Sequence, residues 1–238
     1  MKQYYLGIEF GSTRIKAVLI DSEHRIVKRG DYTWKSSLEN GVWTYHMEDV
    51  QAGLRTAIRA LGELPGDISA MGISGMMHGY LAFDKDWNLL APFRTWQNTM
   101  TGEAADKLTA EFGFNVPQRW SIAHLYQTVL NGEAHVKNIT HITTLAGYVH
   151  YLLTGENVLG VGEASGMFPI DSEALDYDAA MLEKFDALTA RYGFAWTTRS
   201  VLPKVLTAGQ AAGTLTQDGS AFVDGLLPAG IPFCPPEG

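Results

Sequence analysis

The sequence predicts an α/β domain in which a mixed β-sheet is flanked by helices. Two apolar runs within Tyr4–Ile20 are joined by a short glycine-containing turn and predict a β-hairpin. Apolar residues at helical spacing follow within Met47–Leu61, and a buried strand is predicted after them at Ile68–Ser74. A hairpin, a helix and a further strand are typical of the α/β class.

The order of the elements narrows the fold class. A third strand is predicted at Arg25–Thr33, so three antiparallel strands precede the helix and one strand follows it. This is the order of a ribonuclease H-like or actin-like ATPase half-domain. It is not the order of a βαβ dinucleotide fold, and the sequence contains neither GxxxxGK[ST] nor GxGxxG.

The remaining segments alternate between short strands and helices. A polar loop is predicted at Lys35–Tyr45. Short strands are predicted at Tyr80–Phe83, Val158–Val161, Met167–Ile170 and Ile231–Cys234. Helices are predicted at Glu103–Phe112, Ile122–Leu130, Leu145–Leu153, Tyr177–Phe185 and Ala187–Tyr192.

Composition excludes several classes of protein. The 238 residues are 46% hydrophobic and 18% charged, as in a globular protein with a substantial core. The net charge of −8 and the lack of basic runs argue against a nucleic-acid partner. Cys234 is the only cysteine, which rules out an intrachain disulfide and a multi-cysteine zinc site. No apolar run is long enough for a signal peptide or a membrane span, so we expect a cytoplasmic protein.

The turn of the first hairpin carries an unusual set of polar groups. Glu9 precedes it, and Gly11, Ser12 and Thr13 form it. Backbone N–H groups and hydroxyls in such a turn can bind phosphate oxygens, and the carboxylate can hold a metal-bound water. An ordinary hairpin with a polar tip is the alternative, and spacing alone favours it.

Six stretches, taken in order, resemble the N-terminal domain of the FGGY family of carbohydrate kinases, and the xylulokinase-like branch in particular. Each stretch is a weak signal, but their shared order and spacing are specific. They are LGIEFGSTRIKAVLID, MGISGMMHGYLAFD, RTWQN, LLTGE, EASGMFPID and LPKVLTAGQAAGTLT.

The resemblance implies that the first hairpin binds ATP and Mg²⁺. Glu9 stands where the family has a metal-binding carboxylate, and Gly11, Ser12 and Thr13 would face the phosphates. Lys16 stands where some members direct a basic residue at the transferred phosphoryl group. The alternation of Lys16 with core positions also allows for a solvated lysine.

The resemblance also implies a sugar site. Met77 and His78 match the sugar-contacting loop of the family, and Trp96, Gln97 and Asn98 match the next sugar-lining stretch. A polyol needs an apolar wall and a few directed polar groups, and these residues supply both. Without the resemblance, the methionine and tryptophan would be assigned to the core and His78 to a structural role.

Three positions depart from the family pattern. Glu9 replaces the usual aspartate, His124 replaces the lysine of a Ser/Thr-x-x-Lys-Leu signature, and Glu163 is the acidic member of a later Asp/Asn-Ala-Ser motif. These departures indicate a divergent branch and leave the sugar open.

The family places its catalytic aspartate just after a strand and a glycine, at the opening of a second domain. Ile231–Gly238 matches that strand and glycine, so we expect the base immediately beyond Gly238 and residues 1–238 to form the N-terminal domain alone. The missing C-terminal domain is then the expected partner, and the resemblance also allows for a homodimer of the full-length protein.

The expected function is ATP-dependent phosphorylation of a ketose or polyol in the full-length protein, with this fragment inactive. Two alternatives stay open at this stage. One is a non-catalytic sugar-binding module derived from a kinase, and the other is an actin-like ATPase without a sugar substrate.

Overall fold

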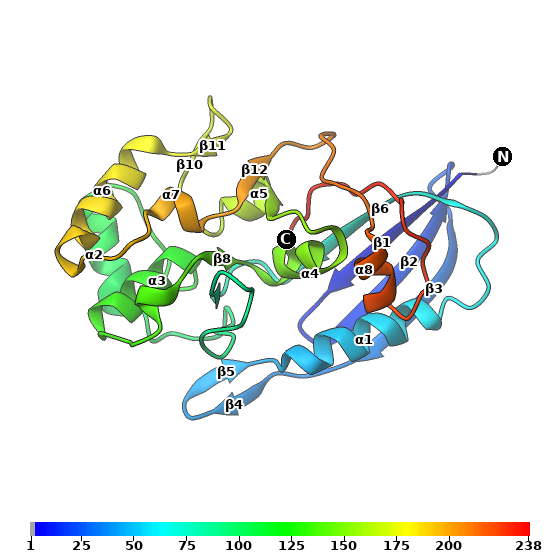
Figure 1. Ribbon diagram of the computed structural model, residues 1–238, viewed down its shortest axis with the longest axis horizontal. Coiled ribbons are helices and arrows are strands. Elements are labelled where there is room, and N and C mark those ends of the chain that lie inside the picture. Colours follow the sequence, from blue (N-terminus) through cyan, green and yellow to red (C-terminus); the bar gives the residue numbers. More distant parts are fainter. Residues whose placement is uncertain (1–2) are drawn as a thin grey trace.

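A four-stranded mixed sheet forms one end of the molecule in the computed structural model, which describes residues 3–238 (Figure 1). Its strand order is β3-β2-β1-β6. The strands are β1 (Tyr4–Phe10), β2 (Arg14–Asp21), β3 (Ile26–Thr33) and β6 (Ile68–Gly75). β1 pairs antiparallel with β2 and parallel with β6, so the predicted mixed sheet is confirmed.

The last residues extend this sheet beyond β6. Met71 N donates to Pro232 O and Cys234 N donates to Met71 O, each over 2.9 Å, and Glu237 N donates to Ile73 O over 3.1 Å. Residues 231–237 therefore run parallel to β6 as a further strand-like segment, in agreement with the predicted strand near the C-terminus.

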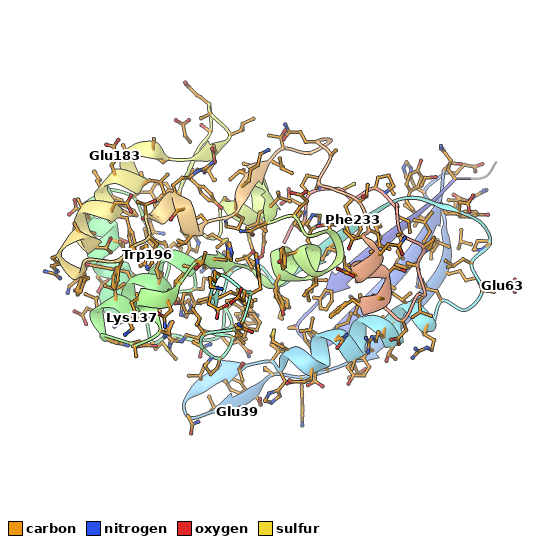
Figure 2. The ribbon with its side chains drawn as sticks, in the orientation of Figure 1. Glu39, Glu63, Lys137, Glu183, Trp196 and Phe233 are labelled. Carbon is orange, nitrogen blue, oxygen red and sulfur yellow. The ribbon has the colours of Figure 1, made fainter. Side chains whose placement is uncertain are left out.

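One face of the sheet carries the core. Leu6, Ile8 and Phe10 point into it, and three helices cover this face: α1 (Met47–Arg59), α4 (Leu145–Thr154) and α8 (Gln217–Phe222). Figure 2 shows Phe233 beside α4, where its ring meets His150 edge-on with centroids 5.2 Å apart. On the opposite face Gly7 and Glu9 are exposed, so apolar and exposed residues alternate along β1.

The other end of the molecule is mainly helical and has its own core (Figure 1). Its helices are α2 (Gly102–Phe112), α3 (Ser121–Leu130), α5 (Val161–Ala164), α6 (Ala179–Thr189) and α7 (Thr198–Val201). Two short 3₁₀ helices are η1 (Val136–Asn138) and η2 (Ala190–Tyr192). Three two-stranded pairs join β7 (Leu81–Phe83) to β8 (His141–Thr143), β9 (Val158–Gly160) to β12 (Lys204–Leu206), and β10 (Ile170–Asp171) to β11 (Asp176–Tyr177).

The predicted polar loop at Lys35–Tyr45 is wrong, because this segment forms a hairpin of β4 (Ser37–Glu39) and β5 (Val42–Thr44). Asn40 and Gly41 connect the strands with φ angles of 50° and 81°. Asn-Gly is the preferred pair for a two-residue hairpin turn that requires positive φ at both positions.

Several later boundaries also differ from the predictions. Val161 begins α5 rather than ending a strand, and Met167–Ile170 is a strand only from Ile170 onward. Tyr177 ends β11, and the two predicted helices after it are one helix, α6, that passes into η2. The helix α8 was not predicted. Short apolar segments do not distinguish strand from helix by period alone, which explains these errors.

Among residues 3–238, every helix is too short or too polar to span a bilayer.

The contact between β3 and α1 depends on Gly30. A Cβ added at Gly30 would overlap Ala57 O and lie 2.9 Å from Ala60 Cβ. We expect Gly30→Ala to lower the free energy of unfolding by about 2–4 kcal/mol, because either the helix or the strand must move. Urea denaturation measures the change.

Gly7→Ala is the matched control, because Gly7 lies in a central strand of the same sheet and an added Cβ meets nothing within 4 Å. We expect it to leave the unfolding midpoint unchanged or slightly raised. Equal midpoints for both variants would contradict close packing of α1 on β3.

Candidate active site

Three parallel segments end together at one edge of the sheet. β1 ends at Phe10, β6 ends at Gly75, and the C-terminal segment reaches Gly238. Hydrogen bonds hold these ends in line: Met76 N donates to Phe10 O over 3.0 Å, and Gly75 N donates to Glu237 O over 3.1 Å. The loops that follow the strands therefore meet at one place.

A cleft of about 570 Å³ opens at this edge. The sheet side contributes residues 9–12 and 74–78 together with Gly238. Two residues from outside the sheet, Trp96 and Arg119, form the remaining wall. Clefts of this size hold small ligands, and the carboxyl ends of parallel strands are a common place for them.

Two aromatic residues fix the turn of the first hairpin. Trp34 Nε1 donates to Gly11 O and Tyr45 Oη donates to Ser12 O, each over 2.7 Å. The backbone N–H of Trp34 donates to Thr13 O over 3.1 Å. The two aromatic rings pack against each other in a tilted arrangement, with centroids 4.3 Å apart. Three consecutive carbonyl groups of the turn thus point toward the protein.

This arrangement sets the direction of the N–H groups. In a planar trans peptide the N–H points opposite to the carbonyl of the preceding residue, so the N–H groups of Ser12 and Thr13 point away from the aromatic pair. Neither these N–H groups nor the two hydroxyls donate to another described residue. The N–H of Gly11 is used within the turn by Arg14 O. Four free donors on a rigid turn suit the oxygens of a phosphate group.

Glu9 and Lys16 pair across the hairpin. Lys16 Nζ lies 2.9 Å from Glu9 Oε2, and both side chains are about half exposed (45% and 49%). Glu9 Oε1 receives no hydrogen bond from the described residues. A single carboxylate combined with phosphate oxygens and waters is a common protein contribution to a Mg²⁺ site, so the residues present fit that ion.

The loop after β6 holds His78 in a defined tautomer. Its backbone has φ of 71°, and Gly79 follows with φ of 96°. Arg119 Nε donates to His78 Nε2 over 3.0 Å. Nδ1, 3.1 Å from Gly166 O, therefore carries the proton and donates it. Because Nε2 accepts a hydrogen bond, the ring is neutral. Burial lowers the pKa of His78, the bond to Gly166 O opposes this, and the charge of Arg119 lowers the pKa further.

The structure brings six of the predicted site residues together in the cleft: Glu9, Gly11, Ser12, Met77, His78 and Trp96. Thr13 is exposed at the tip of the turn, and Lys16 lines a neighbouring groove of about 350 Å³ that also contains Glu9. Gln97 is half-buried outside the cleft lining.

Asn98 has a clear structural role. It is 3% exposed, its Oδ1 accepts from Trp43 N, and its Nδ2 donates to Trp43 O, each over 2.8 Å. These bonds attach the loop that carries Trp96 to β5. All polar atoms of the Asn98 side chain are used by the protein.

Sequence reasoning missed three residues that shape the cleft: Trp34, Tyr45 and Arg119. The first two act on the turn across 23 and 33 residues of sequence, and Arg119 meets His78 across 41 residues. No local motif includes such pairs, so only the tertiary structure identifies them.

Behind the cleft lies a buried carboxyl group. Glu163 is 0% exposed, and a Cβ at Gly238 would overlap its Oε2. Neither of its oxygens makes a regular hydrogen bond with the described residues, although the Thr144 hydroxyl is near. Its backbone N–H donates to Glu237 Oε2 over 2.8 Å. Burial raises the pKa of Glu163 to about 8, and the charge of Glu237 adds to the rise.

The model of the FGGY family of carbohydrate kinases, N-terminal domain, matches residues 4–235. The chain belongs to the FGGY family of carbohydrate kinases. The chain is 26% identical over 230 residues to a glycerol kinase of Thermococcus kodakarensis, a match that covers 90% of the chain and 44% of that protein. It is 23% identical over 249 residues to a xylulose kinase of Escherichia coli, with coverage of 95% and 50%.

Solved structures agree in fold. The crystal structure of a gluconate kinase from Lactobacillus acidophilus superposes with a TM-score of 0.83 at 16% identity, and the match covers 100% of this chain and 49% of that one. The predicted actin-like fold is confirmed. The FGGY chain spans about half the length of the curated relatives it matches.

The buried carboxyl group predicts a pH-dependent stability. The ordinary pKa of a glutamate is 4.5 and that of folded Glu163 is about 8, so between these values the unfolded chain ionises the group while the folded chain keeps the proton. The free energy of unfolding contributed by Glu163 is therefore lost as the pH rises through this window. Replacement by glutamine removes the titration.

We expect the unfolding free energy of Glu163→Gln, relative to wild type, to rise by about 1–3 kcal/mol between pH 5 and pH 8. Urea denaturation at each pH measures it. Burial lowers the pKa of His124 to about 3 and that of His150 to about 4. Both histidines are present in wild type and variant, so their effects on the unfolding free energy cancel in the difference. Glu111→Gln, at an exposed position, is the control and should show a constant difference. Parallel curves for Glu163→Gln and wild type would contradict the burial of a protonated carboxyl.

Proposed function

We propose that this chain is the N-terminal half of an ATP-dependent kinase that phosphorylates a ketose or polyol. The observation that carries the proposal is the hairpin turn whose carbonyl groups face Trp34 and Tyr45 while four donors face outward beside a cleft. Membership in a carbohydrate kinase family supports the choice of a hydroxylated acceptor.

The donor side of the site is built on the turn. The N–H groups of Ser12 and Thr13 bind phosphate oxygens without moving, because the aromatic pair already fixes the backbone, and the two hydroxyls rotate to donate as well. Glu9 is the residue that would hold a Mg²⁺ ion, through its free Oε1, while Lys16 orients the carboxylate from the other oxygen. ATP with Mg²⁺ supplies the phosphoryl group and neutralises its charge.

The acceptor side is the part of the cleft that Met77, Trp96 and Arg119 line. Trp96 is 44% exposed, although large aromatic side chains are usually covered, and it lines the cleft with Met77. Their apolar surfaces suit the C–H face of a sugar and exclude water from it. His78 uses both ring nitrogens within the protein, so its role is to hold the loop and present the ring.

The base and the adenosine pocket belong to the second half of the enzyme in this proposal. The family resemblance assigns the base to an aspartate beyond Gly238, and the relatives are about twice as long as this chain. Water must be excluded from a kinase site by domain closure. Residues 1–238 alone should therefore have negligible kinase activity.

The direct test is a coupled assay of ADP formation by the full-length protein. We expect ADP formation with ATP and Mg²⁺ to depend on one member of a panel of pentuloses, hexuloses, glycerol, pentitols and aldonates. Residues 1–238 expressed alone should give no turnover above background.

Other outcomes would favour other functions. ATP hydrolysis by the full-length protein that no sugar stimulates would favour an ATPase without a sugar substrate. Sugar binding with no nucleotide affinity in the full-length protein would favour a non-catalytic sugar-binding module. Turnover by residues 1–238 alone would overturn the assignment of the base to a second half.

The role of the aromatic pair has a separate test. Trp34→Phe keeps the ring and removes the Nε1–H bond to Gly11 O. We expect the dissociation constant for ADP to rise about 3–10-fold in the full-length protein, since loss of one such bond corresponds to about 1 kcal/mol. Calorimetry with ADP measures it.

Trp196→Phe is the matched control. Trp196 lies in the helical end of the molecule (Figure 2), and its Nε1 donates to Val136 O over 2.8 Å. Both variants lose one indole hydrogen bond to a backbone carbonyl, so both should lose a similar stability. Only Trp34→Phe should weaken ADP binding, and equal affinities in the two variants would contradict the role of the turn.

A further inference from the structure

Arg119 is a cation of the cleft that no carboxylate among residues 3–238 neutralises. Glu9 is the acidic residue that shares the lining, and it is already paired with Lys16. His78 is neutral beside the guanidinium. The acceptor wall therefore has an unbalanced positive charge.

The guanidinium is held in a defined direction. Its Nε–H donates to His78 Nε2 over 3.0 Å, and His78 is in turn fixed by its bond to Gly166 O. Within the described residues, no acceptor takes a hydrogen bond from Nη1 or Nη2. Nη1 and Nη2 therefore have two parallel N–H groups that are available to a ligand. This is the geometry that binds a carboxylate through two hydrogen bonds.

The backbone around Arg119 is fixed as well. Gly79 N donates to Arg119 O over 3.3 Å, and Ser121 Oγ donates to Gly79 O over 2.5 Å. On the preceding residue, Thr101 Oγ1 donates to Gln118 O over 2.5 Å. Arg119 is therefore attached to the loop that carries His78, and a ligand that it binds meets a prearranged group.

We propose that the acceptor substrate carries a carboxylate in addition to its hydroxyls, and that Arg119 binds this carboxylate through Nη1 and Nη2. The inference rests on the proposed function, because it names the substrate class of the same sugar site. The substrate is then a polyol that carries an acid group, such as an aldonate, and the hydroxylated chain extends from the guanidinium along Trp96 and Met77.

Matched ligand pairs test the proposal in the full-length protein. Gluconate and glucitol, and likewise xylonate and xylitol, share their hydroxyls and differ at C1, which is a carboxylate or a CH₂OH group. Calorimetry without nucleotide removes any competing phosphate. We expect one aldonate to bind about 10–100-fold more tightly than its alditol, since a charge-assisted bond to a carboxylate contributes more than a neutral one.

Variants of Arg119 identify the group responsible. Arg119→Gln should remove the preference for the aldonate over its alditol. Arg119→Lys should retain part of this preference, because lysine keeps the positive charge but lacks the two parallel N–H groups of the guanidinium. Arg191→Gln is the control, since Arg191 is exposed at the helical end and stacks on Tyr192 outside the cleft. It should change neither affinity.

Three outcomes would overturn the inference, and they differ in whether the proposed function is overturned with it. Equal affinity for acid and alditol would overturn the inference alone and leave the proposed kinase intact. Loss of ADP or inorganic phosphate binding in Arg119→Gln with unchanged aldonate binding would assign the guanidinium to the phosphate donor. No binding by any ketose, alditol or aldonate would overturn the proposed function together with the inference.

Discussion

The parallel pairing of β1 with β6, and of β6 with residues 231–237, is the constraint on which the cleft depends. Parallel strands end at the same edge of a sheet, so the loops after Phe10 and Gly75 meet there together with Gly238. Each of the three segments brings a different group: a turn with free donors, a neutral histidine and a glycine in front of a buried carboxyl. Antiparallel pairing of β6 would carry the histidine loop to the other end of the sheet.

The hairpin turn shows how a short motif acquires a function from distant residues. A glycine-containing turn with two hydroxyl residues is compatible with many hairpins. The carbonyl acceptors of this turn are all taken by Trp34 and Tyr45, which follow it in sequence and pack under it. The free N–H groups on the outer side are a consequence of peptide planarity. The specificity of the turn thus lies in the two aromatic residues.

The local sequence pattern was enough to predict the elements that surround the core of the four-stranded sheet. The first hairpin, α1 and β6 each have an apolar run or a regular period along the sequence, and each was predicted within about two residues. The β4–β5 hairpin had a sequence signal as well, the pair Asn40-Gly41, which the polar flanks obscured. The contacts of Arg119 could not be predicted, because they join loops that are far apart in the chain and have no period.

The surroundings of His124 in the core of the helical end explain why a histidine replaces the lysine of the family pattern. Its ring is fully buried and stacks with Tyr80 at 6.2 Å, and the guanidinium of Arg94 lies over the same tyrosine at 5.5 Å. Burial lowers the pKa of His124 to about 3 and the charge of Arg94 adds to this, so the ring is neutral. A lysine here would bury a second cation beside Arg94, whose own charge is balanced by Glu133 over 2.5 Å. Among residues 3–238, the buried cation of this region is thus Arg94, and a neutral ring at position 124 is compatible with it.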